Sequence, residues 1–249
     1  GWQEYIRTFY VEAGADKTIW SACNNGVLRS TDGGAHWRIT TGWEITEVLK
    51  VDVDPGNPST VYAATAYGIF KTTDGGSIWK EKKIGLTLPF TSDVVVDRTQ
   101  SKQVFAATEE GVFRSQDGGD TWSVAGLRGK GIRTIIQDPV DPKVLWTGTE
   151  EDGVYRSADG GRKWNQLNKG LNHRTVYAIA VDPKNPSIAY AGTHDGGVYG
   201  TKNAGREWEQ KSKGLKNLVV HSLVVLRSNS AVIFAGTLNG GLYRSTNGG

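Results

Sequence analysis

The sequence has one cysteine, no methionine and no long apolar run in its 249 residues. Cys23 alone cannot form a disulfide within the chain or supply a thiolate cluster for a metal. It lies in a strand-like run at 19–23, where a thiol is usually part of the packing rather than a nucleophile. No apolar stretch reaches the roughly 18 residues that a membrane-spanning helix needs. The sequence therefore gives no support to a disulfide framework, a thiolate metal site or a helical membrane span.

A charge excess of one sign is also missing. The sequence has 29 Lys and Arg against 26 Asp and Glu, a net charge of +3. Such a balance does not indicate a nucleic acid or an anionic membrane as partner. Glycine and tryptophan are abundant instead, with 33 and 9 residues. Together with a hydrophobic content of 37%, they predict a buried core and many tight turns.

One short motif recurs along the chain. It runs from a hydroxyl residue through Asp or Asn and a glycine-containing pair to a Trp, and we refer to each copy as a box turn. The copies are RSTDGGAHW (29–37), KTTDGGSIW (71–79), RSQDGGDTW (114–122), RSADGGRKW (156–164), GTKNAGREW (200–208) and RSTNGG (244–249). Their central residues, 42 to 44 positions apart, are Asp32, Asp74, Asp117, Asp159, Asn203 and Asn247. The chain is therefore six copies of one unit.

Each unit has the pattern of four short β-strands bounded by turn residues. In the second copy these are EVLKVDVD (47–54), VYAAT (61–65), a run near 68–72, and a strand that Trp79 opens. Helical periodicity is not sustained anywhere. The pattern predicts an all-β fold, a single-domain β-propeller with six four-stranded antiparallel blades of about 42 residues. The expected blades are about 5–43, 45–86, 88–129, 131–172, 174–216 and 218–249.

The sixth copy stops at Gly249, before its Trp and its fourth strand. We therefore expect three strands in the last blade and an open edge along 241–245. Further blades in a continuing chain, or a strand added by another chain, would pair with that edge, and we favour the first. The N-terminal stretch does not fit this place, because Trp2 precedes Glu12 by 10 residues whereas Trp37 precedes Asp54 by 17.

The repeated [Ser/Thr]-x-Asp-Gly-Gly-x-x-Trp pattern resembles the BNR or Asp-box repeat. That repeat occurs in the propellers of sialidases, xyloglucan-specific endoglucanases, the sortilin receptor and photosystem II assembly factors. The resemblance covers essentially the whole chain and is specific for fold, but one fold hosts many unrelated activities. By analogy with the family, it implies a secreted or periplasmic protein.

The box turn raises the question of whether its carboxylate is catalytic or structural. Paired glycines can adopt positive φ, and the carboxylate or amide before them can accept hydrogen bonds from the turn's own N–H groups. The amides at Asn203 and Asn247 keep the acceptor but lose the charge, which a catalytic acid could not tolerate. We therefore predict a structural turn, covered by a Trp that packs between sheets. The Trp residues are Trp37, Trp79, Trp122, Trp164 and Trp208.

An acid at the end of the first strand recurs with a base 17 or 18 residues later. The acids are Glu12, Asp54, Asp97 and Asp138, and the bases are Arg29, Lys71, Arg114 and Arg156. Strand geometry would bring each pair to one end of its blade. We therefore expect ion pairs within blades one to four, each contributing about 1 kcal/mol or less if exposed.

Antiparallel order places the turns between strands two and three on the face opposite the box turns, together with the connectors between blades. This face is where related propellers usually hold their site. Its candidate acids and histidine are Glu109, Glu110, Glu150, Glu151, Asp152, His194 and Asp195. Its candidate aromatic and basic residues are Trp43, Tyr67, Phe90, Arg128 and Arg174.

Acids beside exposed rings suit a carbohydrate, since rings stack on sugars and two carboxylates perform acid–base chemistry. They also suit a basic peptide or a hard cation, and charged turns are often no more than solvated. The nearly constant repeat length leaves no loop long enough to wall a deep cleft. Arg7 offers no Arg-Ile-Pro sialidase motif.

We therefore expect a non-catalytic scaffold or interaction propeller that binds a protein or a carbohydrate. No catalytic residue, cofactor or metal site is assigned to it. The alternative is a glycoside hydrolase, xyloglucanase-like or sialidase-like, that uses paired carboxylates on the same face.

Overall fold

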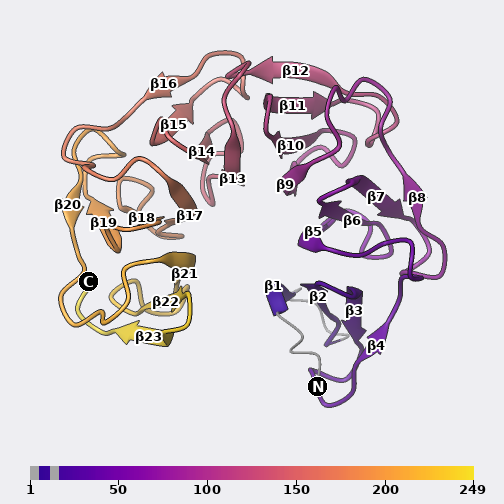
Figure 1. The fold of residues 1–249 in the computed structure, drawn as a ribbon, viewed down its shortest axis with the longest axis horizontal. Helices are drawn as coiled ribbons and strands as arrows, with labels where there is room; N and C mark the ends of the chain where they lie inside the picture. The colour runs from indigo at the N-terminus through magenta and orange to yellow at the C-terminus, as the bar shows by residue number, and fades with distance from the viewer. Residues whose placement is uncertain (1–5, 12–16) are drawn as a thin grey trace. The chain divides into compact units, whose positions relative to one another are not determined.

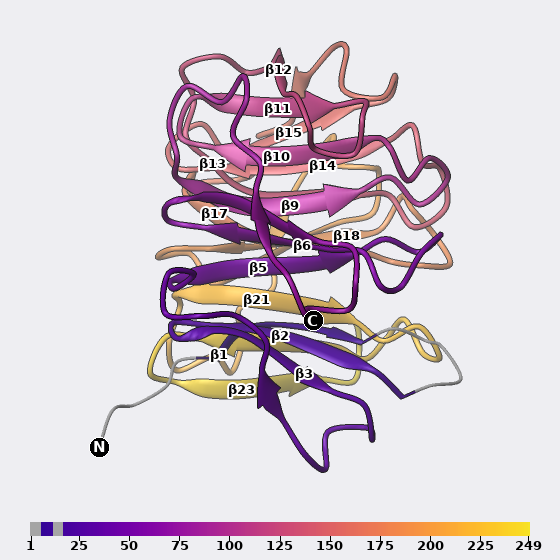
Figure 2. The same ribbon diagram turned by 90° about the vertical axis from the view of Figure 1, so that its right-hand side faces the viewer.

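The structure is a computed structural model that describes residues 6–11 and 17–249. Every regular element within these residues is a β-strand, and the strands form six successive antiparallel sheets (Figures 1 and 2). The fold is all-β, and the sheets are the blades of a β-propeller, as the sequence predicted. Among the described residues, no helix has the length and apolar character needed to cross a membrane.

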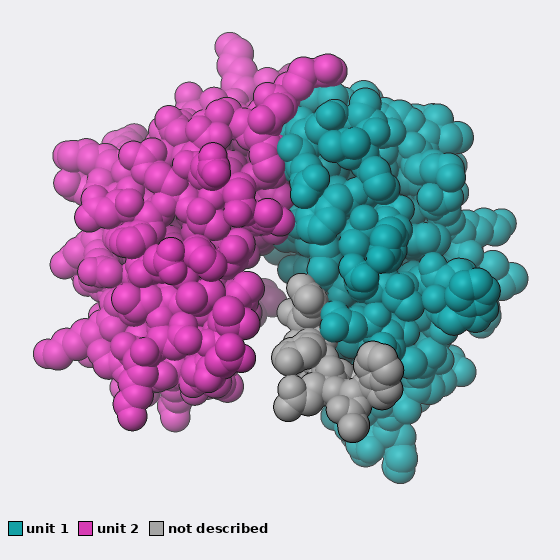
Figure 3. Space-filling view, in the orientation of Figure 1, with its two compact units in different colours: residues 1–125 teal, residues 126–249 magenta. Residues whose placement is uncertain are grey.

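The strands fall into two compact units, residues 1–125 and 126–249, each with three blades (Figure 3). The first three sheets contain β1 Ile6–Val11, β2 Ile19–Cys23, β3 Gly26–Ser30, β4 Arg38–Ile39, β5 Val48–Val53, β6 Val61–Thr65, β7 Gly68–Thr72, β8 Lys80–Glu81, β9 Thr91–Val96, β10 Val104–Thr108, β11 Gly111–Ser115 and β12 Ser123–Gly126. The assignment to a single domain remains a prediction.

The other three sheets contain β13 Ile132–Gln137, β14 Leu145–Thr149, β15 Val154–Ser157, β16 Asn165–Gln166, β17 Val176–Val181, β18 Ala189–Thr193, β19 Val198–Thr201, β20 Glu209–Gln210, β21 Val220–Val225, β22 Ile233–Thr237 and β23 Gly241–Ser245. Each sheet follows chain order. The sixth has three strands, β21 to β23, as expected. On β23 the side chain of Leu242 is 72% exposed.

The core lies between neighbouring blades. In residues 1–125, Trp20 and Val27 of the first blade are buried in one cluster with Val51 and Val61 of the second. The second strands are covered on both sides, and all five residues of β6, β10, β14 and β18 are buried. This burial explains why these strands are continuous apolar or small runs rather than alternating ones.

The box turn is held by hydrogen bonds of its own residues. In the third blade, Ser115 Oγ donates to Asp117 Oδ1 over 2.7 Å, and the Gly119 N–H donates to Ser115 Oγ. Asp117 also accepts the backbone N–H of Thr121 at 2.9 Å and its hydroxyl at 2.6 Å. In the fifth blade Asn203 accepts the hydroxyl of Thr201 and the N–H of Glu207, both over 2.9 Å. The amide thus accepts the same two bonds from the turn, one from the hydroxyl two residues before it and one from the N–H four residues after it.

The box turn also joins its blade to the preceding one. Tyr62 Oη and Lys71 Nζ of the second blade both donate to the carbonyl oxygen of Gly118 in the third, over 2.9 and 2.7 Å. Arg29 likewise donates to Gly75 O over 3.0 Å and lies above the ring of Trp20. The turn therefore presents its carbonyl oxygen to a cation and its glycines to an aromatic ring.

These contacts show that the ion pairs expected in blades two to four are wrong. Among the described residues, none of the acids at 54, 97 and 138 forms an ion pair with its expected base. Asp54 accepts from the Gly56 N–H and the Ser101 hydroxyl, and Lys71 reaches the next blade instead. A base in the third strand extends sideways over the ring opposite it, as Arg156 does over Trp146, and not toward the end of its own blade. Glu12, the expected partner of Arg29, lies outside the described residues.

The box-turn Trp residues are buried to different degrees. Trp122 and Trp208 are buried, Trp79 and Trp164 are half-buried, and Trp37 is 38% exposed. Trp208 packs edge-on against Trp146 with ring centroids 6.4 Å apart, and its Nε1 donates to Leu167 O. Gly170, with φ of +80°, lies so close to Trp208 that a Cβ there would collide with the Trp208 carbonyl oxygen.

We predict that Gly170→Ala destabilises the protein far more than Gly214→Ala. Both glycines have positive φ, +80° and +90°, but a Cβ at Gly214 meets nothing within 4 Å. Gly214→Ala should cost only the strain of positive φ, about 1 kcal/mol, whereas Gly170→Ala should cost about 3 kcal/mol or more. Urea unfolding of both variants measures the difference. Equal losses would show that the blade contact contributes little.

We also predict that Asp117→Ala lowers the melting temperature by roughly 2–4 °C while Asp117→Asn is nearly neutral at pH 7. Hydrogen bonds from Thr121 hold the pKa of Asp117 well below its ordinary value. A lowered pKa gives stability that is present above the unfolded-state value and lost as pH falls through the folded one. Thermal melts at pH 7 and pH 3 should therefore show wild type losing more stability on acidification than Asp117→Asn. An identical loss in both proteins would contradict this role.

Candidate binding face of the blades

Hydrogen bonds between turns establish the two faces of the blades. The box turn of the fourth blade bonds to the turn between its first two strands, through the Gly160 N–H and Lys143 O. We call the side with these turns the box face. The turns between strands two and three bond instead to connectors between blades, as His194 N–H does to Thr175 O and Leu238 N–H to Val219 O. We call that side the connector face, where the sequence placed the site.

In residues 126–249, the first strands bring a row of large side chains to the connector face. The row consists of Arg133, Tyr177 and His221, the second residues of β13, β17 and β21. In each strand the register with its neighbour shifts at this residue. Such a bulge turns a side chain away from the regular alternation. The 44-residue repeat thus places three chemically different groups at equivalent positions.

Tyr177 is the centre of an aromatic cluster. Its ring stacks on His221, with centroids 4.8 Å apart and planes at 13°. His194, from the turn between β18 and β19, contacts the same ring edge-on at 5.5 Å. Burial raises the pKa of the Tyr177 hydroxyl, and the negative charge of Glu150 adds to this. The Tyr177 hydroxyl therefore stays protonated at neutral pH, at the centre of a surface lined by three rings.

Two of the carboxylates beside this cluster are paired with bases. Glu150 bonds Arg133, and Asp152 accepts from Lys130 Nζ over 2.8 Å. The hydrogen bond to Asp152 raises the pKa of Lys130. The turn that carries both acids is fixed further by Asn168, whose side-chain N–H donates to Asp152 O. These carboxylates are thus held in place as parts of ion pairs.

Other predicted residues of this unit surround the cluster. Glu151, Asp195 and Arg128 are exposed, and Asp195 lies 3.8 Å from His194 Nε2. Arg174 is exposed, and its Nε donates to Leu171 O, so it supports the connector.

In residues 1–125 the connector face carries the predicted aromatic residues. Trp43 is 91% exposed, and Tyr67 is 54% exposed with its hydroxyl bonded to Glu47 over 2.9 Å. Phe90 is half-buried. Of the predicted acids, Glu109 is exposed and Glu110 accepts a hydrogen bond from the Thr87 hydroxyl.

A second polar cluster in this unit was not predicted. Asp52 on β5 accepts the Val96 N–H of the next blade's first strand over 2.7 Å. Lys50 Nζ lies 3.8 Å from the buried carboxylate of Asp93. Burial raises the pKa of Asp52 to about 7, and this effect exceeds the opposing influence of the Val96 hydrogen bond and of Lys50. Perturbed carboxyl groups of this kind are common in functional sites, and they also occur in structural networks.

The first-strand residues were not predicted, because the predicted site residues were all in turns and connectors. A signal was present: the second residue of each first strand recurs every 44 positions as Arg133, Tyr177 and His221. The polar Lys50 and Asp52, inside an otherwise apolar run, were a similar signal.

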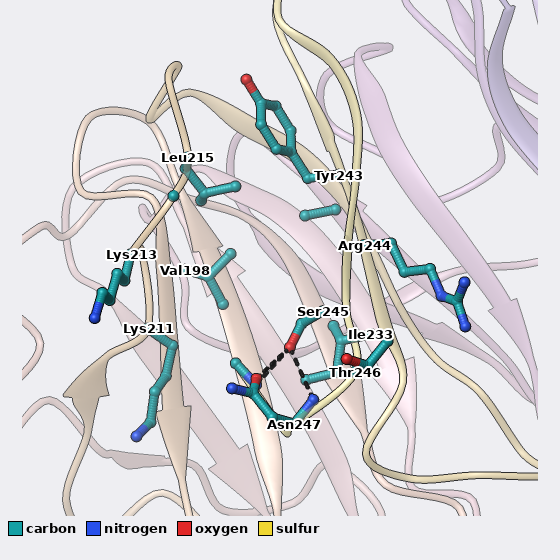
Figure 4. Close-up of a pocket in the computed structure, with 13 residues that line it drawn as sticks. Val198, Lys211, Lys213, Leu215, Ile233, Tyr243, Arg244, Ser245, Thr246 and Asn247 are labelled. Carbon is teal, nitrogen blue, oxygen red and sulfur yellow. Dashed lines mark hydrogen bonds between the residues drawn. The ribbon is translucent and has the colours of Figure 1, made fainter.

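A pocket of about 370 Å³ lies between the fifth and sixth blades. Val198, Leu215 and Ile233 form apolar parts of its wall, and Ser245 and Asn247 of the last box turn lie at one end (Figure 4). In the preceding pair of blades Trp208 packs at the equivalent place, beside Gly170. The pocket therefore belongs to the packing of blades rather than to the connector face.

Comparisons with known proteins show the fold. No family model matches the chain, and no curated protein matches its sequence. An ancestral GH74 enzyme matches over 96% of this chain, at a TM-score of 0.82 and 21% identity. The extracellular domain of BT4673 from B. thetaiotaomicron matches at 0.77 and 16%, and YCF48 bound to D1 peptide at 0.69 and 16%, over 96% and 98% of this chain.

The lengths of these proteins differ. This chain spans 36% of the ancestral GH74 enzyme and 32% of the BT4673 chain, but 78% of YCF48. At these identities the likeness carries the β-propeller fold alone.

We predict that Asp52→Asn makes the protein more stable than wild type at pH 8, by about 2 kcal/mol, and much less so at pH 4. A carboxyl group with a raised pKa keeps its proton on folding. The protein therefore keeps its full stability below the pKa that Asp52 has in the unfolded state, and it loses stability as pH rises through about 7, the pKa in the folded state. The neutral amide can still accept the Val96 N–H. Urea unfolding at both pH values measures the gain, and an equal gain at pH 4 and pH 8 would contradict the assignment.

Proposed function

We propose that this protein is a non-catalytic interaction propeller whose connector face binds a protein or a glycan. Its box turns are of the BNR or Asp-box type, as their sequence and hydrogen bonds support. The contact surface in residues 126–249 is the aromatic cluster of Tyr177, His194 and His221, flanked by the ion pairs of Glu150 and Asp152.

The observation that carries this proposal is that, on the connector face, ion pairs engage carboxylates while aromatic rings stay at the surface. Glu150 and Asp152, next to the cluster, are bonded to Arg133 and Lys130, while the three rings remain together at the surface. A general acid or nucleophile has to reach its substrate, and a carboxylate in an ion pair is poorly placed to do so. Rings with fixed polar groups around them instead suit recognition of a sugar or a peptide.

The related folds support both kinds of ligand. One structural neighbour is bound to a peptide, and another belongs to a GH74 enzyme. A neighbour that is an extracellular domain supports our assignment of the chain to a compartment outside the cytoplasm.

A glycoside hydrolase is the second candidate, and one observation favours it. Asp52, with a pKa near 7, and Asp93 are two carboxyl groups on adjacent first strands of residues 1–125. A raised pKa is what a general acid needs. The Val96 N–H that Asp52 accepts gives it a structural task as well, so we rank this function second.

The test is binding of the purified protein to a glycan array and a peptide library, followed by affinity measurements on the hits. Tyr177→Ala and His221→Ala should each weaken binding by about tenfold, since stacked rings contribute on the order of 1 kcal/mol or more. Val140→Ala, which shortens an exposed apolar side chain on the box face of the same unit, is the matched control and should leave affinity unchanged.

The same hits distinguish the two functions. Sugar hits should be bound without release of reducing ends. Release that Asp52→Asn abolishes would contradict the proposal and establish the hydrolase. Equal losses of affinity in Tyr177→Ala and Val140→Ala would show that the connector face of this unit is not the site.

A further inference from the structure

The balanced net charge of the chain conceals a strong asymmetry. Residues 1–125 hold 12 Lys and Arg against 16 Asp and Glu, whereas residues 126–249 hold 17 against 10. The second unit is therefore basic, with a net charge of +7. Charge of this size on half of a chain indicates an electrostatic partner, provided that the cations share a surface.

Many of these cations do share a surface, the box face of the fourth and fifth blades. Six exposed ones are Lys143, Arg162, Lys163, Lys184, Lys202 and Arg206. The hydrogen bonds of Gly160 N–H to Lys143 O and of Ala204 N–H to Ser187 O hold each box turn against the neighbouring turn of its blade.

The surface continues into the sixth blade. Lys184 Nζ donates to Ser228 O of that blade, and the Ser230 hydroxyl donates to Asp182. The exposed side chain of Arg227 lies in the same turn as Ser228. Cations therefore recur across three consecutive blades on one face.

The acids of the turns on this face accept hydrogen bonds from their own turns or are buried. Asp138 and Asp182 are buried. Asp159 accepts the backbone N–H groups of Arg162 and Lys163 over 3.0 and 2.9 Å. Asp141 accepts the Lys143 N–H in the same way. The turn carboxylates therefore bond to the backbone of their own turns, and the exposed Glu207 of the fifth box turn pairs with Lys169, so none of these acids forms an ion pair with the six cations.

The ion pairs of this unit do not include the six cations. In the part of the chain that the structure describes, the Lys and Arg side chains of this unit that form ion pairs are Lys130, Arg133, Lys169 and Lys211. The two cations of the fourth box turn are also not a general property of the repeat. The box positions equivalent to Arg162 and Lys163 in the first three blades hold Ala35 and His36, Ser77 and Ile78, and Asp120 and Thr121.

We infer that the box face of residues 126–249 is a second binding surface, and that its partner is an acidic polysaccharide. A chain with carboxylate or sulfate groups at regular intervals matches cations that recur from blade to blade. Single-stranded nucleic acid fits less well, because binding it usually requires exposed rings for stacking and the box-turn rings here, Trp164 and Trp208, are half-buried and buried. Duplex readout needs a helix or ribbon that enters a groove, and tight turns cannot.

The experiment measures heparin affinity of the purified protein by calorimetry between 50 and 200 mM NaCl. Binding should weaken steeply with salt, as contacts between cations and a polyanion do. The quadruple variant R162E/K163E/K202E/R206E should lose at least about tenfold in affinity.

The matched control is K17E/R38E/K80E/K102E, which makes the same change in net charge on exposed side chains of residues 1–125. It should lose less than about threefold. If the quadruple variant does not fold, R162Q/K163Q alone should still weaken heparin binding relative to the pair R38Q/K80Q.

Several outcomes would overturn the inference. These are equal losses in the variant and its control, binding of duplex DNA or of anionic phosphatidylserine vesicles without binding of heparin, and no heparin binding at 50 mM NaCl. Tyr177→Ala, on the connector face, should bind heparin as wild type does. The two surfaces are therefore tested independently of each other.

Discussion

The contact of a box turn with the preceding blade is the interaction on which the rest of the structure depends. A four-stranded sheet has no core of its own, and its apolar side chains are buried only against the next sheet. The carbonyl oxygen of Gly118, held by Tyr62 and Lys71, sets that position in residues 1–125. Because Asp117 is engaged within its own turn, the oxygen is presented in a fixed direction. The hydrogen bonds within the box turn thereby help to set the distance between neighbouring blades.

The same constraint explains where chemistry can vary. Residues that build the box turn or the second strands are occupied by packing, so differences between blades concentrate at exposed turns and at the bulged second residue of each first strand. Arg133, Tyr177 and His221 occupy equivalent bulges yet form an ion pair on one side and a ring stack on the other. Arg162 and Lys163 occupy box positions where no other blade has two cations. Both proposed surfaces are thus formed by residues that differ between blades, on a blade structure that is repeated.

Sequence reasoning reached the strand order, the six-fold repeat and the three-stranded last blade because these follow from periodicity and glycine spacing. The predicted ion pairs between the acid and the base of a unit were wrong, because the prediction considered only contacts within one blade. Lys71 reaches sideways to a carbonyl oxygen that is 47 residues away in sequence. The cluster of Tyr177, His194 and His221 was missed for a similar reason: only one member, His194, is in a turn, and a bulge is not visible in a pattern of alternating residues.

The most direct test of the central claim is hydrogen–deuterium exchange of the protein with and without its best-binding neutral glycan or peptide. The account predicts slower exchange at the connector-face turns 150–153 and 194–197 and at the start of β17 and β21. Exchange at the box turns 157–161 and 201–205 should not change. Protection confined to the box turns, or to the polar cluster of Asp52 and Asp93, would contradict the assignment of the connector face as the binding site.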